Sequence, residues 1–181
     1  MLPTEHPALH RLSIEDVHRM VDVGVLGEDD RVELIDGVLV DVSPPSPEHS
    51  AIVSWLTRHF VLGCPDRDVR VQDLLLVEGG FVLPDLMVIE PTARDRHPET
   101  AALVVEVAIT TLRHDTAKAR RYARAGVGEY WLVDVARRCV VVHSGAGRDG
   151  CAATTVHGDG ALVPAPAGAP AVDIGELLGS G

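Results

Sequence analysis

Residues 101–134 read AALVVEVAITTLRHDTAKARRYARAGVGEYWLVD, and this stretch decides the fold. Ala101–Ile109 is an almost continuous apolar run, which predicts a strand covered on both faces. Leu112–Ala125 has helical spacing and ends at Gly126, and Glu129–Asp134 predicts another strand. This pattern favours an α/β domain in which helices pack against a mixed β-sheet.

The segment before this core predicts a helix and a hairpin. Ser13 is placed to cap a helix with acidic residues in its first turn, and this helix ends near Gly24. Arg31–Val42 alternates about Asp36-Gly37, which is a strong signal for a two-residue hairpin turn. Glu33 lies in the first strand of that hairpin, on the face opposite its two apolar neighbours.

The segments that flank the core predict further helices and strands. A Pro-rich connection leads into a helix capped by Ser46 and ended by Gly63. Residues 69–77 and 81–90 then form a second hairpin-like pair about Gly79-Gly80. Cys139–His143 continues the sheet after the core.

The C-terminal part differs in composition from the rest. Residues 145–171 are rich in Gly, Ala and Pro, which predicts short strands and loops, and Asp173–Leu178 predicts a closing turn of helix. The sequence contains no internal repeat and no second core. We therefore expect a single domain over residues 1–181, with an N-terminal arm at 1–12 and a C-terminal extension at 145–181 packed on the core.

The charge balance and the cysteines restrict the classes of protein. With 16 Lys and Arg against 27 Asp and Glu among 181 residues, the net charge is −11, which disfavours a surface that grips nucleic acid everywhere but permits a local basic site. Three scattered cysteines fit a reducing cytoplasm, and the nine histidines lack zinc-site spacing. We expect no membrane span and no secretory signal, and hence a cytoplasmic protein.

Three acidic residues lie within apolar strand patterns, where an unpaired carboxylate costs several kcal/mol. They are Glu33 in VELI, Asp85 in LPDLMVI and Glu106 in LVVEVAI. The common partner for such a group is a hard divalent cation, so the sequence predicts a Mg²⁺ site, in which Mn²⁺ is expected to substitute. Asp85 and Glu106 are 106 − 85 = 21 residues apart, a spacing that suits adjacent strands.

Lys118 is the only lysine among the 16 basic residues. It lies on the helix that follows Glu106, where an ammonium group would orient water and stabilise charge on a transferring phosphoryl group. Its retention in a chain that otherwise uses Arg favours a role for a compact cation. Chance retention is the alternative.

These pieces resemble the Uma2 family (DUF820), which is described as an endonuclease family of the PD-(D/E)XK superfamily. The matching segments occur in family order, and they are RVELIDGVLVDVSPPSPEHSAIV (31–53), VRVQ (69–72), PDLMVIE (84–90), LVVEVAITT (103–111) and DTAKARRYARAGVGEYWLVD (115–134). The resemblance implies a restriction-endonuclease-like core, with a mixed sheet flanked by helices.

The resemblance also implies roles for individual residues. Asp85 after Pro84 and Glu106 match the two metal-binding acids, and Glu33 matches an additional acid of the metal site. Position 108 is Ala instead of the superfamily's Lys, and Lys118 matches the place to which the family lysine has moved. The family has a Ser-Pro-Ser type of stretch after the second acid, where this chain has Ile109-Thr110-Thr111.

Several further residues are candidates for binding roles, each with a structural alternative. The helix of Lys118 carries four arginines that predict contacts to phosphates, or else a solvated helix face: Arg113, Arg120, Arg121 and Arg124. His49 matches a position that is often histidine in the family and is an accessory candidate, although helix capping or packing explains it too. Gln72 is either a substrate-binding amide or a cross-strand amide.

Three functions fit this set of residues. The first is a Mg²⁺-dependent endonuclease that hydrolyses phosphodiester bonds of DNA, with Glu33, Asp85, Glu106 and Lys118 as catalytic residues. The second is an inactive binding or regulatory module that keeps the nuclease fold. The third is a metal-dependent hydrolase of a small phosphate ester. We also expect a homodimer, because two-fold oligomers are common and frequent in the superfamily.

Overall fold

The computed structural model describes residues 10–27, 29–109, 115–147 and 150–179, and the elements below lie in these ranges. Four helices are present, α1 (Ile14–Asp22), α2 (Pro47–Gly63), α3 (Asp115–Arg124) and α4 (Ile174–Leu178). The strands are β1 (Val32–Ile35), β2 (Val38–Asp41), β3 (Asp68–Arg70), β4 (Leu75–Val77), β5 (Gly80–Val82), β6 (Leu86–Ile89), β7 (Leu103–Ala108), β8 (Glu129–Asp134), β9 (Cys139–Gly147), β10 (Gly150–His157), β11 (Leu162–Val163) and β12 (Val172–Asp173).

The described strands form one large sheet and two smaller ones. The large sheet has six strands in the order β10-β9-β8-β7-β6-β3, with β7 and β8 parallel and all other neighbours antiparallel. A second sheet has the order β2-β1-β5-β4, and β11 pairs with β12. The parallel pair is connected through α3, as the sequence of residues 101–134 predicts.

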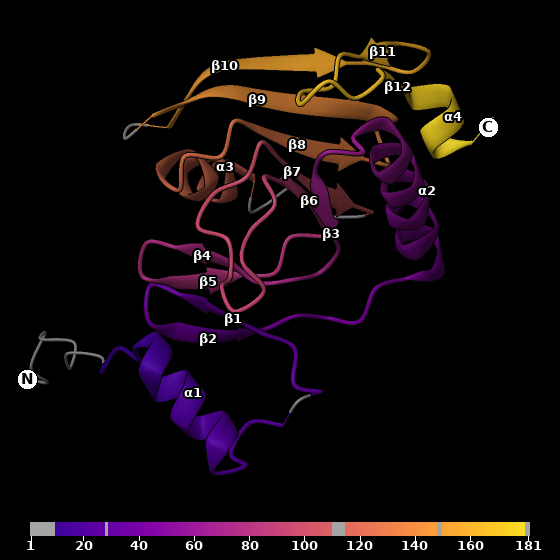
Figure 1. Cartoon of the computed structure of the whole chain (residues 1–181). Coiled ribbons are helices and arrows are strands. Elements are labelled where there is room, and N and C mark those ends of the chain that lie inside the picture. Colours follow the sequence, from indigo (N-terminus) through magenta and orange to yellow (C-terminus); the bar gives the residue numbers. More distant parts are fainter. Residues whose placement is uncertain (1–9, 28, 110–114, 148–149, 180–181) are drawn as a thin grey trace, which may run out of the picture.

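The two faces of β7 are covered by different elements (Figure 1). Leu103, Val105 and Val107 pack in a core formed with α2 and α4. Val104, on the opposite face, packs in a second core with residues of α3 such as Tyr122. Because side chains alternate along a strand, the side chain of Glu106 lies on the face that α3 covers.

The four-stranded sheet lies between α1 and the rest of the molecule (Figure 1). Leu34 of β1 packs with Val17 of α1 and with Phe81, in a third and smaller core. Glu33 is adjacent to Leu34 on the strand, so its side chain faces away from α1. This arrangement directs Glu33 toward the side on which α3 and the large sheet lie.

The elements that the sequence predicts most clearly are confirmed. Ser13 caps α1 through a capping box with Asp16, and the Ser46 side chain accepts a hydrogen bond at the start of α2. Asp36 and Gly37 both have positive φ, at 50° and 76°, as the predicted two-residue hairpin turn requires. The mixed α/β fold class is therefore confirmed.

The second hairpin-like pair is predicted with the wrong connectivity. Residues 69–77 and 81–90 do not form two continuous strands, because each run is divided between two sheets. β4 and β5 pair in the four-stranded sheet, whereas β3 and β6 pair in the six-stranded sheet. The breaks fall at Gln72, whose φ is +50°, and at Pro84, which has no N–H to donate to a ladder.

The C-terminal extension contains more strand than its composition predicts. β9 runs on to Gly147, and β10 adds eight residues at the edge of the large sheet, where the sequence predicts only short strands and loops. Gly and Ala mislead here because β-propensity reflects packing against neighbouring strands rather than an intrinsic preference. The closing helix is confirmed as α4, with Asp173 as its cap.

Part of the predicted N-terminal arm packs on the domain. The Leu12 N–H donates a 2.9 Å hydrogen bond to the Gly37 carbonyl, and the Leu12 side chain packs against the core at α1. Residues 1–9 of the arm lie outside the described residues. No helix in the described part of the chain is long and apolar enough to cross a membrane.

We predict that Gly80→Ala destabilises the domain by about 2–3 kcal/mol, because the new Cβ overpacks the contact between two strands. A Cβ at Gly80 would lie 1.9 Å from the Leu34 carbonyl oxygen, where β5 pairs with β1. Urea denaturation measures the loss. Gly158→Ala is the control, because a Cβ there meets nothing within 4 Å, and its expected change is within about 0.5 kcal/mol. Equal stability of the two variants would contradict this description of the sheet.

Candidate active site

One cavity of about 420 Å³, beside the start of α2, is lined by five residues with charged, imidazole or amide side chains. They are Arg31, His49, Gln72, Asp85 and Glu106. The Pro-rich connection that precedes α2 forms part of the wall. We call this space the acidic cavity.

The Asp85 carboxylate is held through one of its oxygens. Asp85 Oδ2 accepts a 2.8 Å hydrogen bond from the Val107 N–H of β7, and His49 Nε2 lies 2.9 Å from the same oxygen. Because a carboxylate only accepts, Nε2 is the nitrogen that carries a proton. The two side chains are 12% and 14% exposed, so the interaction is largely shielded from water. His49 thus reaches the site from α2, as the family position indicates.

The Glu106 carboxylate is also held through one oxygen. Glu106 Oε1 accepts a 2.6 Å hydrogen bond from the Tyr122 hydroxyl, and Lys118 Nζ lies 2.9 Å from it. Lys118 and Tyr122 are four residues apart on α3, so they lie on one helix face and reach the same atom. Glu106 is 8% exposed, which makes these two donors its principal stabilisation.

Burial and neighbouring charges shift the protonation equilibria of these groups. Burial raises the pKa of the Glu106 carboxyl, the negative charge of Asp85 raises it further, and Lys118 and Tyr122 offset only part of the effect. Burial alone would lower the pKa of Lys118, but the attraction of Glu106, Glu33 and Asp85 outweighs it and raises that pKa. Burial and Glu106 raise the pKa of Tyr122 well above its usual range. Lys118 therefore remains a cation, and Tyr122 a neutral donor, at physiological pH.

Glu33 occupies a different place from the other two acids. It is 8% exposed, and its Oε1 accepts a 3.0 Å hydrogen bond from the Leu83 N–H, just before Pro84-Asp85. Its charge acts on Lys118, but Glu33 does not line the described acidic cavity. The structure thus brings Glu33 close to the lysine and to the segment that carries Asp85, and its role as a metal ligand stays a prediction.

Gln72 lies at the break between β3 and β4. The apolar run at 69–77 predicts instead that it lies inside a strand. The Gln72 N–H is shared between the carbonyls of Pro84 at 3.1 Å and Asp85 at 3.3 Å. The backbone there has a φ of +50°, which is uncommon for a residue other than glycine. These bonds fix the segment that presents Asp85, and they place the Gln72 side chain at the wall of the acidic cavity.

The residues fit a divalent cation that takes few protein ligands. Among the described residues no three His, Cys, Asp or Glu side chains are grouped closely enough to hold a metal ion together. Mg²⁺ typically needs only one or two carboxylates and completes its shell with waters and phosphates. Asp85 and Glu106 repel each other across one cavity, and a cation between them would relieve that repulsion.

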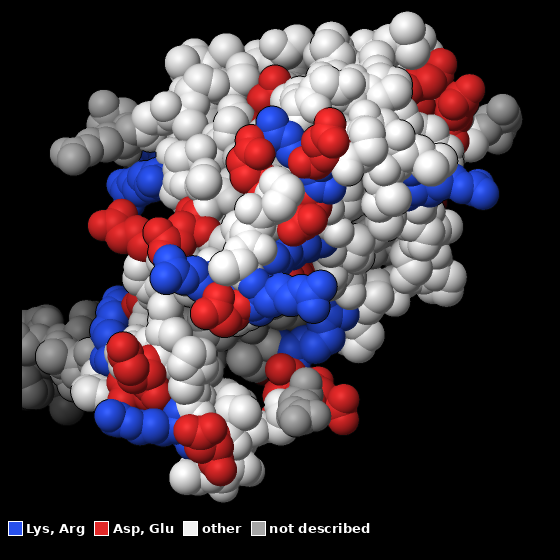
Figure 2. Space-filling model, viewed as in Figure 1, with Lys and Arg blue, Asp and Glu red and all other residues white. Residues whose placement is uncertain are grey.

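The predicted arginine contacts lie farther along α3. Arg120, Arg121 and Arg124 line a separate pocket, outside the acidic cavity. Figure 2 shows basic and acidic side chains side by side on the face in view, instead of one continuous basic surface. Arg113 lies outside the described residues, and so do Thr110 and Thr111 of the loop that departs from the family pattern.

Sequence reasoning missed two residues of the site. Tyr122 shares a helix face with Lys118, and this spacing was the signal that could have assigned it to Glu106. Arg31 lines the acidic cavity although it begins a hairpin far away in the sequence. No local pattern predicts that approach, because it depends on how the two sheets pack.

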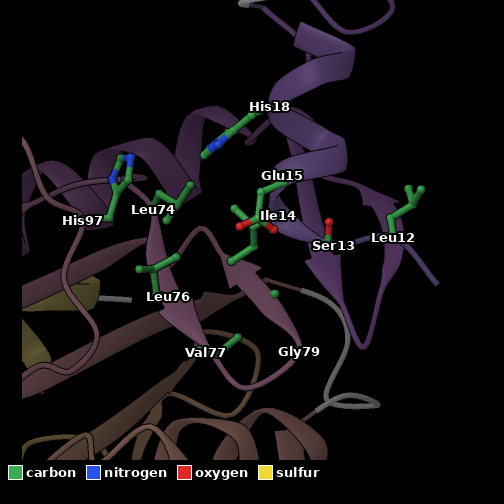
Figure 3. Close-up of a pocket in the computed structure, with 11 residues that line it drawn as sticks. Leu12, Ser13, Ile14, Glu15, His18, Leu74, Leu76, Val77, Gly79 and His97 are labelled. Atoms are coloured by element: carbon green, nitrogen blue, oxygen red, sulfur yellow. The ribbon is translucent and has the colours of Figure 1, made fainter.

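A second cavity of about 440 Å³ lies between α1 and the β4–β5 hairpin (Figure 3). It is slightly larger than the acidic cavity and mainly apolar, with Ile14, Leu74 and Leu76 among the residues that line it. His18 and His97 lie at its sides, on α1 and on the loop before β7 (Figure 3). Size alone therefore does not identify the site, and the paired acids do.

The mixed sheet carries buried acids, and a lysine from the following helix contacts one of them, as the resemblance to the Uma2 family implies. The sequence model of the family Uma2, described as "Putative restriction endonuclease", matches residues 14–174. The chain belongs to the Uma2 family. None of the curated proteins compared with the chain matches it.

A solved structure has the same fold. It is the crystal structure of "a putative nuclease belonging to DUF820" from Anabaena variabilis ATCC 29413, at 18% sequence identity and a TM-score of 0.72. The similarity covers 87% of this chain and 94% of that chain. The restriction-endonuclease-like fold predicted from the resemblance is thus confirmed over most of the molecule.

We predict that Tyr122 and Glu106 are energetically coupled by about 1–3 kcal/mol, as expected for a buried hydrogen bond to a charged acceptor. The measurement is a double-mutant cycle with Tyr122→Phe and Glu106→Gln, in which urea denaturation gives the free energy of unfolding. The control cycle combines Tyr122→Phe with Glu48→Gln, because Glu48 is exposed on α2. The changes in the free energy of unfolding of these two variants should add within about 0.5 kcal/mol. Additivity in both cycles would contradict the described bond.

Proposed function

We propose that this protein is a Mg²⁺-dependent endonuclease that hydrolyses phosphodiester bonds of DNA. The observation that carries the proposal is that Asp85, just before β6, and Glu106 of β7 line one cavity, while Lys118 of α3 contacts Glu106 at 2.9 Å. Membership of a family described as restriction endonucleases supports a nuclease-like function.

Asp85 and Glu106 would hold Mg²⁺. Each carboxylate uses one oxygen to accept two donors, namely Val107 and His49 for Asp85, and Tyr122 and Lys118 for Glu106. No hydrogen bond from the part of the chain that the structure describes reaches the second oxygen of either acid, and that oxygen would bind the cation. When bound, Mg²⁺ supplies Lewis-acid stabilisation of a phosphoryl group and lowers the pKa of a coordinated water.

Lys118 would stabilise the negative charge that develops on the phosphate in the transition state. Its ammonium stays protonated because the attraction of Glu106, Glu33 and Asp85 raises its pKa, so it would act as a fixed cation and orient water rather than serve as a base. Its side chain is 31% exposed, compared with 10% for Glu106, so Lys118 is the more accessible member of this pair.

His49, Tyr122 and Glu33 would position the reacting groups. His49 and Tyr122 each occupy one oxygen of an acid, which restricts how that carboxylate can turn. Glu33 anchors the backbone of Leu83, two residues before Asp85, and adds negative charge beside Lys118. A site built in this way needs little reorganisation when a substrate arrives.

One observation favours a second function, that of a binding module without turnover. Both acids already have a cationic or proton-donating partner in the protein, His49 for Asp85 and Lys118 for Glu106. Such pairs satisfy buried carboxylates without a metal. Calorimetric titration with Mg²⁺ or Mn²⁺ separates the two functions, since binding that Glu106→Gln abolishes favours the enzyme and an absence of binding favours the module.

We predict that the wild-type protein cleaves DNA only with Mg²⁺ or Mn²⁺, and that Asp85→Asn lowers the cleavage rate by at least about 10²- to 10³-fold, because one ligand charge is lost. The measurement is gel-resolved cleavage of plasmid and linear DNA with each metal and with EDTA. Asp66→Asn, on the exposed turn after α2, is the matched control and should cut at the wild-type rate. A wild type inert on every nucleic acid, or equal cutting by Asp85→Asn, overturns the proposal.

We predict that Lys118→Arg and Lys118→Met both lower the cleavage rate by about 10²-fold, because a planar guanidinium does not reproduce the position of the ammonium beside Glu106. Single-turnover rates at saturating DNA report the chemical step. Arg19→Lys, on the exposed face of α1, is the control for a change between the two cations. Full activity of Lys118→Arg would contradict this prediction, because it would show that the position needs only a positive charge and not the geometry of an ammonium.

A further inference from the structure

A pocket of about 410 Å³, separate from the acidic cavity, lies between α3 and two hairpin turns. Its lining includes Arg120, Arg121 and Arg124 of α3, Asp36 of the β1–β2 turn and Glu78 of the β4–β5 turn. We call it the arginine pocket. It therefore gathers three guanidinium groups against two carboxylates in a chain whose net charge is −11.

The arginine pocket and the candidate catalytic lysine involve the same helix, α3. Arg121 is three residues after Lys118, so the two residues lie on one side of α3, about 4.5 Å apart along its axis. Lys118 contacts Glu106 in the acidic cavity, whereas Arg121 faces Asp36 in the arginine pocket. One helix thus presents cations to both spaces.

Asp36 engages the central arginine only loosely. Arg121 Nη2 lies 3.7 Å from Asp36 Oδ2, longer than a hydrogen bond, and the Asp36 side chain is 69% exposed whereas that of Arg121 is 17% exposed. Because the carboxylate of this pair is largely exposed to water and too distant for a hydrogen bond, the pair contributes little to stability. Arg121 is therefore available to a stronger anionic partner that displaces the aspartate.

We infer that the arginine pocket binds the phosphodiester backbone of the nucleic-acid strand next to the bond that is cut, and that Asp36 competes with this strand for Arg121. The inference rests on the proposed function, because it places the flanking phosphates relative to Lys118. Guanidinium groups recognise phosphate oxygens by paired, charge-assisted hydrogen bonds. Backbone contacts of this kind position a strand and carry no sequence preference.

The competition by Asp36 gives the inference two tests of opposite sign. Removing two arginines should weaken binding, whereas removing the carboxylate of Asp36 should strengthen it. Asp36→Asn suits the second test, because Asn adopts positive φ readily and Asn-Gly is a preferred sequence for this hairpin turn. The substitution therefore removes one negative charge and preserves the local backbone.

The experiment measures fluorescence anisotropy of a labelled 30-base-pair duplex and of its single strand, in EDTA so that no cleavage occurs, over a series of salt concentrations. Arg121→Gln/Arg124→Gln should weaken duplex binding about tenfold and reduce the slope of log K against log salt by about 1.8, or about 0.9 for each lost contact. Asp36→Asn should tighten binding about two- to threefold.

The control is Arg19→Gln/Arg94→Gln, which removes the same charge at two exposed positions. Arg19 lies on α1, and Arg94 lies on the loop after β6, whereas Asp85 precedes that strand. This double variant should leave the slope unchanged. Equal effects of the two double variants, weaker binding by Asp36→Asn, or no binding of either DNA by the wild type would overturn the inference. Cleavage is measured separately. If the wild type cleaves DNA but the double variant leaves the salt slope unaltered, only the binding role of the arginine pocket is refuted. If the wild type binds DNA through the arginine pocket but does not cleave it, only the nuclease function is refuted.

Discussion

The site depends on the burial of Glu106 within the large sheet. A carboxylate with 8% exposure at the centre of β7 is unfavourable unless charge and hydrogen bonds compensate for its lost hydration. Lys118 and Tyr122 provide both, and they require α3 to pack against this face of β7. The position of the helix, the raised pKa of the lysine and the geometry of the acidic cavity all follow from this one constraint.

The fold was predictable where local sequence patterns coincide with the packing of the elements. The strand at 103–108, the helix that follows and the strand at 129–134 are read correctly from their periodicity, and so are the Asp36-Gly37 turn and the caps of α1 and α2. β10 was predicted only as part of a region of short strands and loops, because residues 145–171 are rich in Gly, Ala and Pro. It is held instead by pairing along β9, which is a tertiary effect.

The candidate site was predictable in its residues but not in their partners. Acids in apolar strands and a single lysine identify Asp85, Glu106 and Lys118, because their chemistry conflicts with their surroundings. The partners of two of the acids come from distant segments: His49 from α2 for Asp85, and the Leu83 backbone for Glu33. Such contacts depend on the packing of two sheets and a helix, and no local spacing encodes them.

Asp85 lies where the chain passes from the four-stranded sheet to the six-stranded sheet. The backbone there is tied on one side by Glu33 to Leu83, and on the other by the N–H of Gln72 to Pro84 and Asp85. Glu33 belongs to the first sheet and Glu106 to the second, while Lys118 responds to the charge of both. A small shear between the sheets would therefore change the distance between the acids and the potential at the lysine together. The packing of the two sheets therefore sets the relative positions of Glu33, Asp85 and Glu106.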